Sequence, residues 1–320
     1  MSAFEPFETF GDLDEIATAL VSPDASVRRL AVIEIAETAS PDAIGYLASA
    51  VSDAVAEVRL QAVRALGEFD GRTVAQALAR GVVDSDQGVA SAAADSLAEI
   101  RDAAAGDVLL PLVSHPSAFV RAAIFRSLKA LRIDAALGPA VTALADKDAD
   151  VRVQAVGVIG YLKLIETLPS LIGAARDESA DVRLAAINAL SFARNLAAAQ
   201  AAADALADPE WQVRAAAAET IGRIGQASSS NAVLTILNDP YWQVRQKALQ
   251  CFGKLKARDA VTDIVAVLDD PLPSLRKEAA AALGDIADAR ARGALAERAS
   301  DLDPDVRKTI VWALGQLRGA

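Results

Sequence analysis

The sequence predicts an all-helical protein built from ten stacked repeats, and three observations support this. A Val-Arg pair or a close variant recurs ten times, each copy lies 31 residues after the one before, and apolar residues follow each copy at helical spacing. A fixed period of this length is typical of an array in which each unit packs only on its neighbours. The first residues of the ten copies, which number repeats 1 to 10, are Val27, Val58, Val89, Val120, Val151, Val182, Val213, Val244, Leu275 and Val306.

Each repeat contains one strongly patterned helix, which we call the B helix. With the Val taken as position 0, positions +4 and +8 are apolar in every copy, as at Ala62 and Leu66, and they define one buried face. Asp stands at position −5 in eight copies and Pro at −4 in five, which predicts an Asp N-cap followed by Pro in the first turn. Gly at +9 in six copies predicts close packing or an exit from the helix.

A second, shorter helical pattern, the A helix, lies between successive B helices. Its most regular feature is an apolar residue seven positions before each Val, for example Val51 and Leu144. Neither helix can bury its apolar stripe alone, so we expect ten stacked pairs to share one continuous core.

Composition excludes several classes of protein. The net charge is −11 and Lys and Arg form no basic block, which argues against nucleic acid or an anionic membrane as a partner. A single cysteine excludes an intrachain disulfide. The acidic opening segment lacks the basic start and apolar run of a secretory signal, and no apolar stretch is long enough to span a bilayer. We therefore expect a cytoplasmic protein.

The chain lacks the usual constellations of catalytic residues. Its one histidine, His115, precedes a proline, and it is interpreted as a substitute for the usual Asp before the B helix rather than as a metal ligand. Cys251 falls at position +7 beside an apolar Phe, so we expect a packed residue instead of a reactive thiol. No phosphate-binding loop or nucleophile motif is present. We expect no metal, no cofactor and no catalytic residue.

The pattern Asp-Pro-x-x-x-Val-Arg, present at residues 208–214 and 239–245, resembles the HEAT-like repeats first associated with phycobilin lyases. The resemblance covers roughly residues 12–320. It implies a right-handed α-solenoid, a superhelix of ten two-helix repeats, whose B helices line the concave side. We expect residues 12–320 to form this single solenoid and residues 1–11 to form a tail or cap.

The resemblance also implies a ladder in which the Asp at −5 and the Arg at +1 pair between successive repeats. Ala90, His115 and Ser22 depart from the pattern, so we expect an interruption near repeats 3 and 4. The ladder residues singled out for this structural role are Asp53, Arg59, Asp146, Arg152, Asp177, Arg183, Asp208, Arg214, Asp239 and Arg245.

Positions −2, +2, +6 and +10 form a stripe on the B helix about 200° from the buried Val. In the geometry that the resemblance implies, this stripe faces the concave groove. Aromatic residues enter it at Trp211, Trp242, Tyr161 and Phe192, in repeats 5 to 8, and large aromatic side chains are typical of interface hot spots. The polar residues predicted beside them are Arg126, Asn188, Arg223, Gln246 and Gln250. Alternatively, each Trp folds onto the next repeat, and Tyr161 and Phe192 pack inward.

The sequence therefore predicts a non-enzymatic scaffold that binds a protein or peptide in its groove. The alternative is a bilin or tetrapyrrole lyase or chaperone that uses the same groove. Phe4, Phe7 and Phe10 could cap the first repeat or dock on another protein, and Trp312 in the last repeat suggests self-association through the solenoid ends.

Overall fold

The computed structural model describes residues 13–317, and within that range all regular secondary structure is helical. The all-helical prediction is therefore confirmed. The predicted tail or cap, with Phe4, Phe7 and Phe10, lies outside the described residues. The chain forms two compact units, residues 1–162 and 163–320, and each is described by itself.

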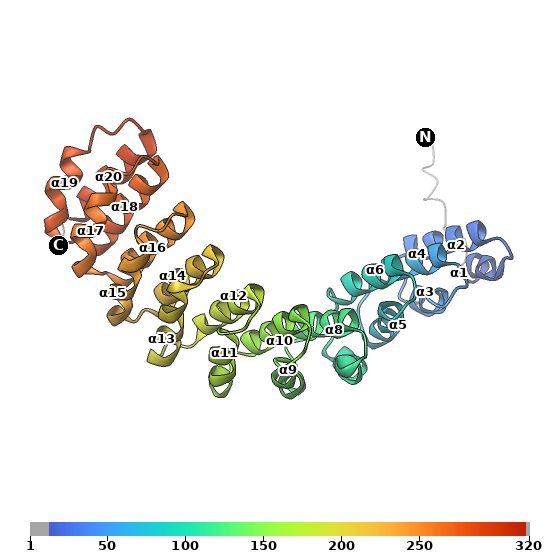
Figure 1. Cartoon of the computed structure of the whole chain (residues 1–320). Coiled ribbons are helices and arrows are strands. Elements are labelled where there is room, and N and C mark those ends of the chain that lie inside the picture. The colour runs from blue at the N-terminus through green and yellow to red at the C-terminus, as the bar shows by residue number, and fades with distance from the viewer. Residues whose placement is uncertain (1–12, 318–320) are drawn as a thin grey trace, which may run out of the picture. The chain divides into compact units, whose positions relative to one another are not determined.

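In the N-terminal unit, A and B helices alternate and form two layers (Figure 1). The B helices are α2 (Ala25–Glu37), α4 (Ala56–Leu66), α6 (Gln87–Leu97), α8 (Ala118–Leu131) and α10 (Ala149–Leu162). The A-helix segments are α1 (Leu13–Ala17), α3 (Ala43–Ala50), α5 (Arg72–Val82), α7 (Gly106–Leu109) and α9 (Leu137–Ala143).

The C-terminal unit repeats this arrangement, and its B helices lie on the inner side of a curved row (Figure 1). They are α12 (Ala180–Ala189), α14 (Trp211–Ile224), α16 (Trp242–Leu255), α18 (Pro273–Ile286) and α20 (Pro304–Gln316). The A helices are α11 (Leu168–Ala174), α13 (Leu196–Asp204), α15 (Ser230–Val233), α17 (Val261–Val267) and α19 (Arg292–Glu297).

Short 3₁₀ segments begin or end many of the helices. Those that end an A helix are η1 (Thr18–Val21), η3 (Leu110–Ser114), η7 (Ala205–Ala207) and η9 (Leu234–Ile236), and η6 (Leu190–Phe192) ends α12. Those that begin an A helix are η2 (Ala103–Ala105), η4 (Asp134–Ala136), η5 (Ile165–Thr167), η8 (Ala227–Ser229), η10 (Arg258–Ala260) and η11 (Ala289–Ala291).

The B helices begin two residues before the Val, so the prediction of an Asp N-cap at position −5 is wrong. In repeat 7, for example, α14 begins at Trp211, and a carboxylate oxygen of Asp208 accepts a hydrogen bond from the Glu210 amide at 2.9 Å. The Asp at −5 thus closes a turn that leads into the helix, as short polar side chains commonly do. Only Pro273 and Pro304 occupy a first helical position among the B helices.

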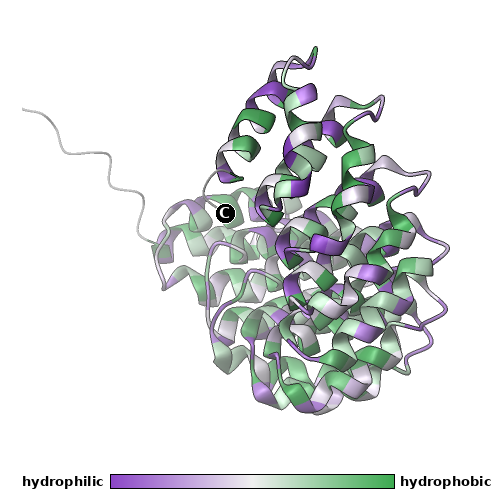
Figure 2. Ribbon diagram, turned by 90° about the vertical axis from the view of Figure 1, so that its left-hand side faces the viewer, coloured by the Kyte–Doolittle hydropathy of each residue, from purple (hydrophilic) through white to green (hydrophobic). Residues whose placement is uncertain are grey.

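The predicted core positions are buried in both units, except at the two ends of the array, where Val27 is 40% exposed and Leu314 is half-buried. In α14, Val213, Ala217 and Ile221, at positions 0, +4 and +8, are at most 1% exposed. The residues at these positions are also buried in the neighbouring repeats. The loops between helices are largely hydrophilic (Figure 2). The helix pairs therefore stack by burying apolar faces, which is the main stabilising term in such arrays.

The Gly at position +9 serves close packing between consecutive B helices. Several B helices end three residues later at a left-handed residue, such as Lys256 or Gly225, so in these repeats the chain does not leave the helix at +9. In repeat 2 it does, since α4 ends at Leu66 and Gly67 is its C-cap. A Cβ added at Gly284 would lie 2.5 Å from the Trp312 ring and 2.9 Å from the Cα of Ala313 in the next B helix. At Gly315, the same position of the last repeat, a Cβ would meet nothing within 4 Å.

Gly284→Ala should therefore destabilise the C-terminal unit by about 1–2 kcal/mol, because the Ala313 backbone cannot rotate away from the added methyl group. Gly315→Ala is the matched control, and it should be neutral or stabilise by up to about 1 kcal/mol through helix propensity. Urea unfolding followed by circular dichroism measures both. Equal effects of the two substitutions would show that the +9 glycines do not serve packing.

Candidate functional site

Arginines at position +1 and aspartates at −5 of the following repeat form bidentate ion pairs. In the pair of Arg183 and Asp208, Nε and Nη2 lie 2.7 and 2.8 Å from the two carboxylate oxygens. Arg245 and Asp270 make a looser contact at 3.5 Å, and the Arg245 Nε is buried without an acceptor. The other bidentate pairs are Arg28–Asp53, Arg59–Asp84, Arg121–Asp146, Arg214–Asp239 and Arg276–Asp301.

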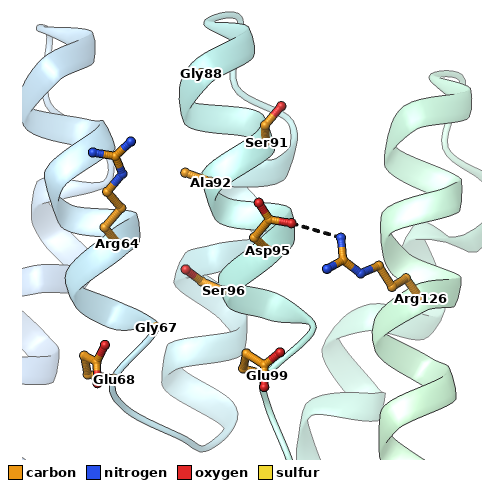
Figure 3. A pocket seen from close by; sticks show the side chains of 10 residues that line it. All are labelled: Arg64, Gly67, Glu68, Gly88, Ser91, Ala92, Asp95, Ser96, Glu99 and Arg126. Atoms are coloured by element: carbon orange, nitrogen blue, oxygen red, sulfur yellow. Dashed lines mark hydrogen bonds and ion pairs between the residues drawn. The ribbon is translucent and has the colours of Figure 1, made fainter. Parts of the chain in front are cut away.

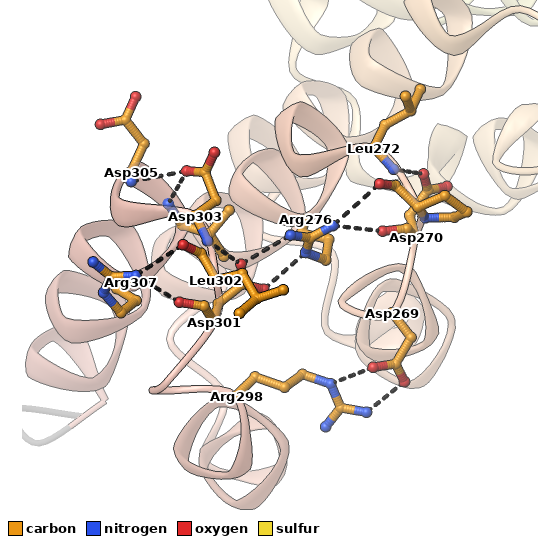
Figure 4. Close-up of polar contacts among 12 residues, drawn as sticks. Asp269, Asp270, Leu272, Arg276, Arg298, Asp301, Leu302, Asp303, Asp305 and Arg307 are labelled. Carbon is orange, nitrogen blue, oxygen red and sulfur yellow. Dashed lines mark hydrogen bonds and ion pairs between the residues drawn. The ribbon is translucent and has the colours of Figure 1, made fainter.

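Each arginine is also anchored to its own repeat. Nη1 of Arg276 donates to the carbonyl oxygens of Asp270 and Pro271, and Arg307 holds the corresponding carbonyls of the last repeat (Figure 4). Arg152 likewise donates to the carbonyls of residues 146 and 147. The ladder arginines therefore bind backbone and carboxylate at once, which is a structural role.

The ion pairs shift the pKa values of the ladder carboxyls. A hydrogen bond from Arg28 lowers the pKa of Asp53 below its usual range. Burial alone would raise the pKa of Asp208, but the hydrogen bond from Arg183 and three smaller favourable contributions outweigh it, so this pKa is also lowered. These aspartates are therefore ionised at neutral pH.

One ladder position between repeats 3 and 4 lacks both partners. Ala90 replaces the ladder arginine of repeat 3, and His115 replaces the ladder aspartate of repeat 4. Because both members of the pair are replaced, no arginine or aspartate is left without its partner at this position. Nδ1 of His115 accepts a hydrogen bond from the Ser117 amide at 3.2 Å, which reproduces the turn that Asp closes elsewhere. Here α6 and α8 pack less closely than other neighbouring B helices of this unit. Ser22, the third departure, belongs to repeat 1, which follows no earlier repeat among the described residues.

Positions −2, +2, +6 and +10 form the surface of the B helices that we call the B face, and most of their side chains are exposed or half-buried. In repeats 2 to 4 it holds a shallow depression of about 580 Å³ (Figure 3). Arg126 reaches across it and donates to a carboxylate oxygen of Asp95 at 2.9 Å. Glu68 and Glu99 also line the depression. This part of the B face is polar and carries no aromatic ring in its lining.

Three aromatic residues of the C-terminal unit, Trp211, Tyr241 and Trp242, lie where α14 and α16 begin. Trp211 stacks on Tyr241, with ring centroids 5.6 Å apart and planes inclined by 15°. The guanidinium of Arg214 lies 5.8 Å from the centroid of the Tyr241 ring. Trp242, the next residue, is 42% exposed. Trp211 thus covers the start of the next B helix, which was the alternative interpretation, whereas Trp242 presents an accessible ring.

The predicted polar residues on α14 and α16 contact neighbouring helices. Gln246 and Gln250 both donate to the same carboxylate oxygen of Glu278 in α18, each at 3.2 Å. Arg223 forms an ion pair with Glu219 in its own helix. Together with Trp242 these side chains form a stripe along the B face. The Trp242 ring lies at the start of α16, and the Gln246 and Gln250 amides and the Arg223 guanidinium lie further along the helices.

The other predicted site residues were expected to lie in the same stripe, and they do not. Tyr161 and Arg126 belong to the N-terminal unit, where the Arg132 guanidinium lies 5.1 Å from the Tyr161 ring centroid. Phe192 is half-buried in η6, which packs on α14, and Asn188 is exposed on α12. The sequence interpretation missed Tyr241. The sequence does contain a pattern that could have identified it, because Tyr241 and Trp242 are adjacent aromatic residues where α16 begins.

The environment of the single cysteine does not favour a reactive thiol. Cys251 is buried, and burial raises the pKa of its thiol to about 12, so the thiolate is scarce at neutral pH. Within residues 13–317, no cluster of three or more His, Cys, Asp or Glu side chains could hold a metal ion. None of the helices in this range is long and apolar enough to cross a membrane.

A sequence model of HEAT repeats matches residues 13–89, 137–222, 199–276 and 261–320. The unmatched stretch, residues 90–136, holds the ladder position at which both charges are absent. No curated protein matches the chain.

Solved structures of similar fold include an engineered protein, importin beta and a Kap95 complex. The engineered protein is 19% identical with a TM-score of 0.55, and the match covers 96% of this chain and 98% of the other. Importin beta is 16% identical with a TM-score of 0.66, over 95% of this chain and 50% of the other. Kap95 in complex with Nup1 is 16% identical with a TM-score of 0.63, over the same shares. The chain thus spans about half the length of importin beta and of Kap95, and the likeness shows the fold.

Proposed function

The chain belongs to the HEAT-repeat family, and we propose that it is a non-enzymatic scaffold whose B face in repeats 7 and 8 binds a protein segment. The exposed ring of Trp242 carries this proposal. Trp, with Tyr and Arg, is among the residues enriched in interface hot spots. A ring left 42% exposed at the start of a B helix is suited to a partner's apolar side chain.

The surroundings of Trp242 favour binding at low entropic cost. Tyr241 is held between Trp211 and Arg214, so its ring is already fixed before a partner arrives. Ordering a loose side chain on binding costs about 0.5–1.5 kcal/mol, and a ring that is already stacked avoids part of that cost. The amides of Gln246 and Gln250 lie further along the same stripe and supply polar contacts at its rim.

The similar structures are consistent with a protein-binding role. One of them is Kap95 bound to Nup1, and another concerns Kap95 binding to RanGDP. With identities of 15–16% they support the class of function only, and they do not identify the partner of this chain.

Partner capture from the native host tests the proposal. Trp242→Ala should weaken binding of the captured partner at least tenfold, because truncating a hot-spot Trp costs more than about 1.4 kcal/mol. Trp312→Ala is the matched control, since Trp312 is similarly exposed on the B face of repeat 10. It should leave affinity unchanged. Equal binding by the wild-type chain and Trp242→Ala, with helicity preserved in both, would contradict this site.

The tetrapyrrole alternative remains a prediction from the sequence. It requires a change in the absorption spectrum of a bilin when the purified chain is added, and no such change is expected from a scaffold that binds only protein.

A further inference from the structure

The last repeat exposes a position that is buried in every other repeat. Position +5 is at most 5% exposed in repeats 1 to 9, but Val311, at +5 of repeat 10, is 65% exposed. In repeat 2 the side chain at this position packs on the next A helix, since a Cβ at Gly81 would lie 2.8 Å from Cγ1 of Val63. Val311 therefore lies on a surface shaped to receive the A helix of a further repeat.

The same surface carries a ladder arginine without its carboxylate. Nη1 of Arg307 donates to the carbonyls of Asp301 and Leu302 at 2.7 and 3.0 Å, the same anchors that orient the internal arginines (Figure 4). In the described part of the chain, no carboxylate forms an ion pair with Arg307. The guanidinium is thus held in the ladder orientation with its carboxylate-binding edge unused.

The first repeat exposes the opposite side of a repeat interface. Position 0 is at most 2% exposed in repeats 2 to 10, but Val27 is 40% exposed. The A-helix segment of repeat 1, formed by α1 and η1, contains no buried residue. Ala19 of η1 occupies the position of Gly81, so a small residue stands where a +5 side chain would pack.

We propose that the last repeat of one copy binds the first repeat of a second copy, head to tail, as though the array continued. Val311 would pack on the second copy's η1, and Arg307 would face its Ser22 and Asp24. An acid at position −3, as at Asp24, already accompanies the internal pairs, for example Asp303 beside Arg276. Such a contact joins two different surfaces, so each copy can bind one neighbour at either end, and copies assemble into open chains or closed rings.

Ser22 keeps this association weak. It takes the place of the ladder Asp and still closes the same turn, since its hydroxyl accepts a hydrogen bond from the Asp24 amide at 3.2 Å. It cannot form a bidentate ion pair with a guanidinium. Restoring the Asp at this position should therefore strengthen the contact without altering the local fold.

Analytical ultracentrifugation over a wide concentration range tests the proposal. The mean mass of the full chain should rise with concentration beyond that of a dimer. Ser22→Asp should tighten association by roughly three- to tenfold. Arg307→Glu should weaken it by a similar factor and should cancel the effect of Ser22→Asp in the double variant. Trp242→Ala should leave association unchanged, which separates this interface from the B-face site.

Two results would overturn the proposal. One is a monomer at every concentration, with Ser22→Asp included, as a cap over the first repeat would produce. The other is an association that responds to neither Ser22→Asp nor Arg307→Glu. Circular dichroism of each variant checks that the substituted chains remain folded.

Discussion

Arg183→Ala should lower the free energy of unfolding of the C-terminal unit by about 2–3 kcal/mol. The substitution removes two charge-assisted hydrogen bonds to Asp208, whose side chain is only 6% exposed. It leaves that carboxylate mostly buried beside the amide of Glu210, with no guanidinium against it. An uncompensated, poorly solvated charge is more costly than the loss of an exposed ion pair.

Arg307→Ala is the matched control for this prediction. Arg307 occupies the same repeat position and holds the same two backbone carbonyls, but it has no ion pair with a described carboxylate. The substitution should change stability by less than about 0.5 kcal/mol. Urea unfolding of both variants at neutral pH measures the difference. Similar losses would mean that the backbone contacts, and not the ion pairs, account for the contribution of these arginines.

Acidic pH should lower the stability of the folded chain, because the ladder carboxyls become protonated over the same range of pH. The folded-state pKa values of Asp53, Asp84, Asp146, Asp208 and Asp239 are lowered, and that of Asp301 is lowered as well. A carboxyl with a lowered folded-state pKa contributes its full stabilisation above the unfolded value of about 3.9. The contribution is lost as the pH falls below that value and through the folded pKa. Because six carboxyls act together, the loss should be steep.

Thermal unfolding between neutral pH and strongly acidic buffers measures this effect. The melting temperature should be nearly constant down to about pH 5 and should then fall continuously. In Arg183→Ala the slope should be shallower, because the pKa of Asp208 loses the hydrogen bond that lowers it. Arg307→Ala should change the slope much less, because Arg307 makes only the smallest of the contributions that lower the pKa of Asp301. A melting temperature that is independent of pH in acid would contradict the role of the ladder.

The period and the buried face were predictable because they depend on spacing alone. Residues at 0, +4 and +8 lie on one side of a helix whatever its exact ends, so the core positions of repeats 2 to 9 were correct. The helix start was not predictable in the same way, since Asp is as suited to closing a turn before a helix as to capping one. Asp208 closes the turn, and the helix begins three residues later at Trp211.

The site was harder to predict because it depends on where side chains point. Trp211 and Trp242 share position −2, but only Trp211 has an aromatic residue, Tyr241, at the start of the following repeat on which to stack. Gln246 and Gln250 were expected to supply polar contacts in the groove, and Glu278 of the next helix accepts a hydrogen bond from each. Such pairings join residues from different repeats, and a pattern read within one repeat does not contain them.

Hydrogen exchange of the chain with and without its captured partner tests the central claim most directly. Binding at the B face of repeats 7 and 8 should slow exchange in the first turns of α14 (Trp211–Ile224) and α16 (Trp242–Leu255). The Trp242→Ala variant should show no such protection at the same partner concentration. Protection confined to the A helices α13, α15 and α17 would place the partner on the other layer and would contradict the account.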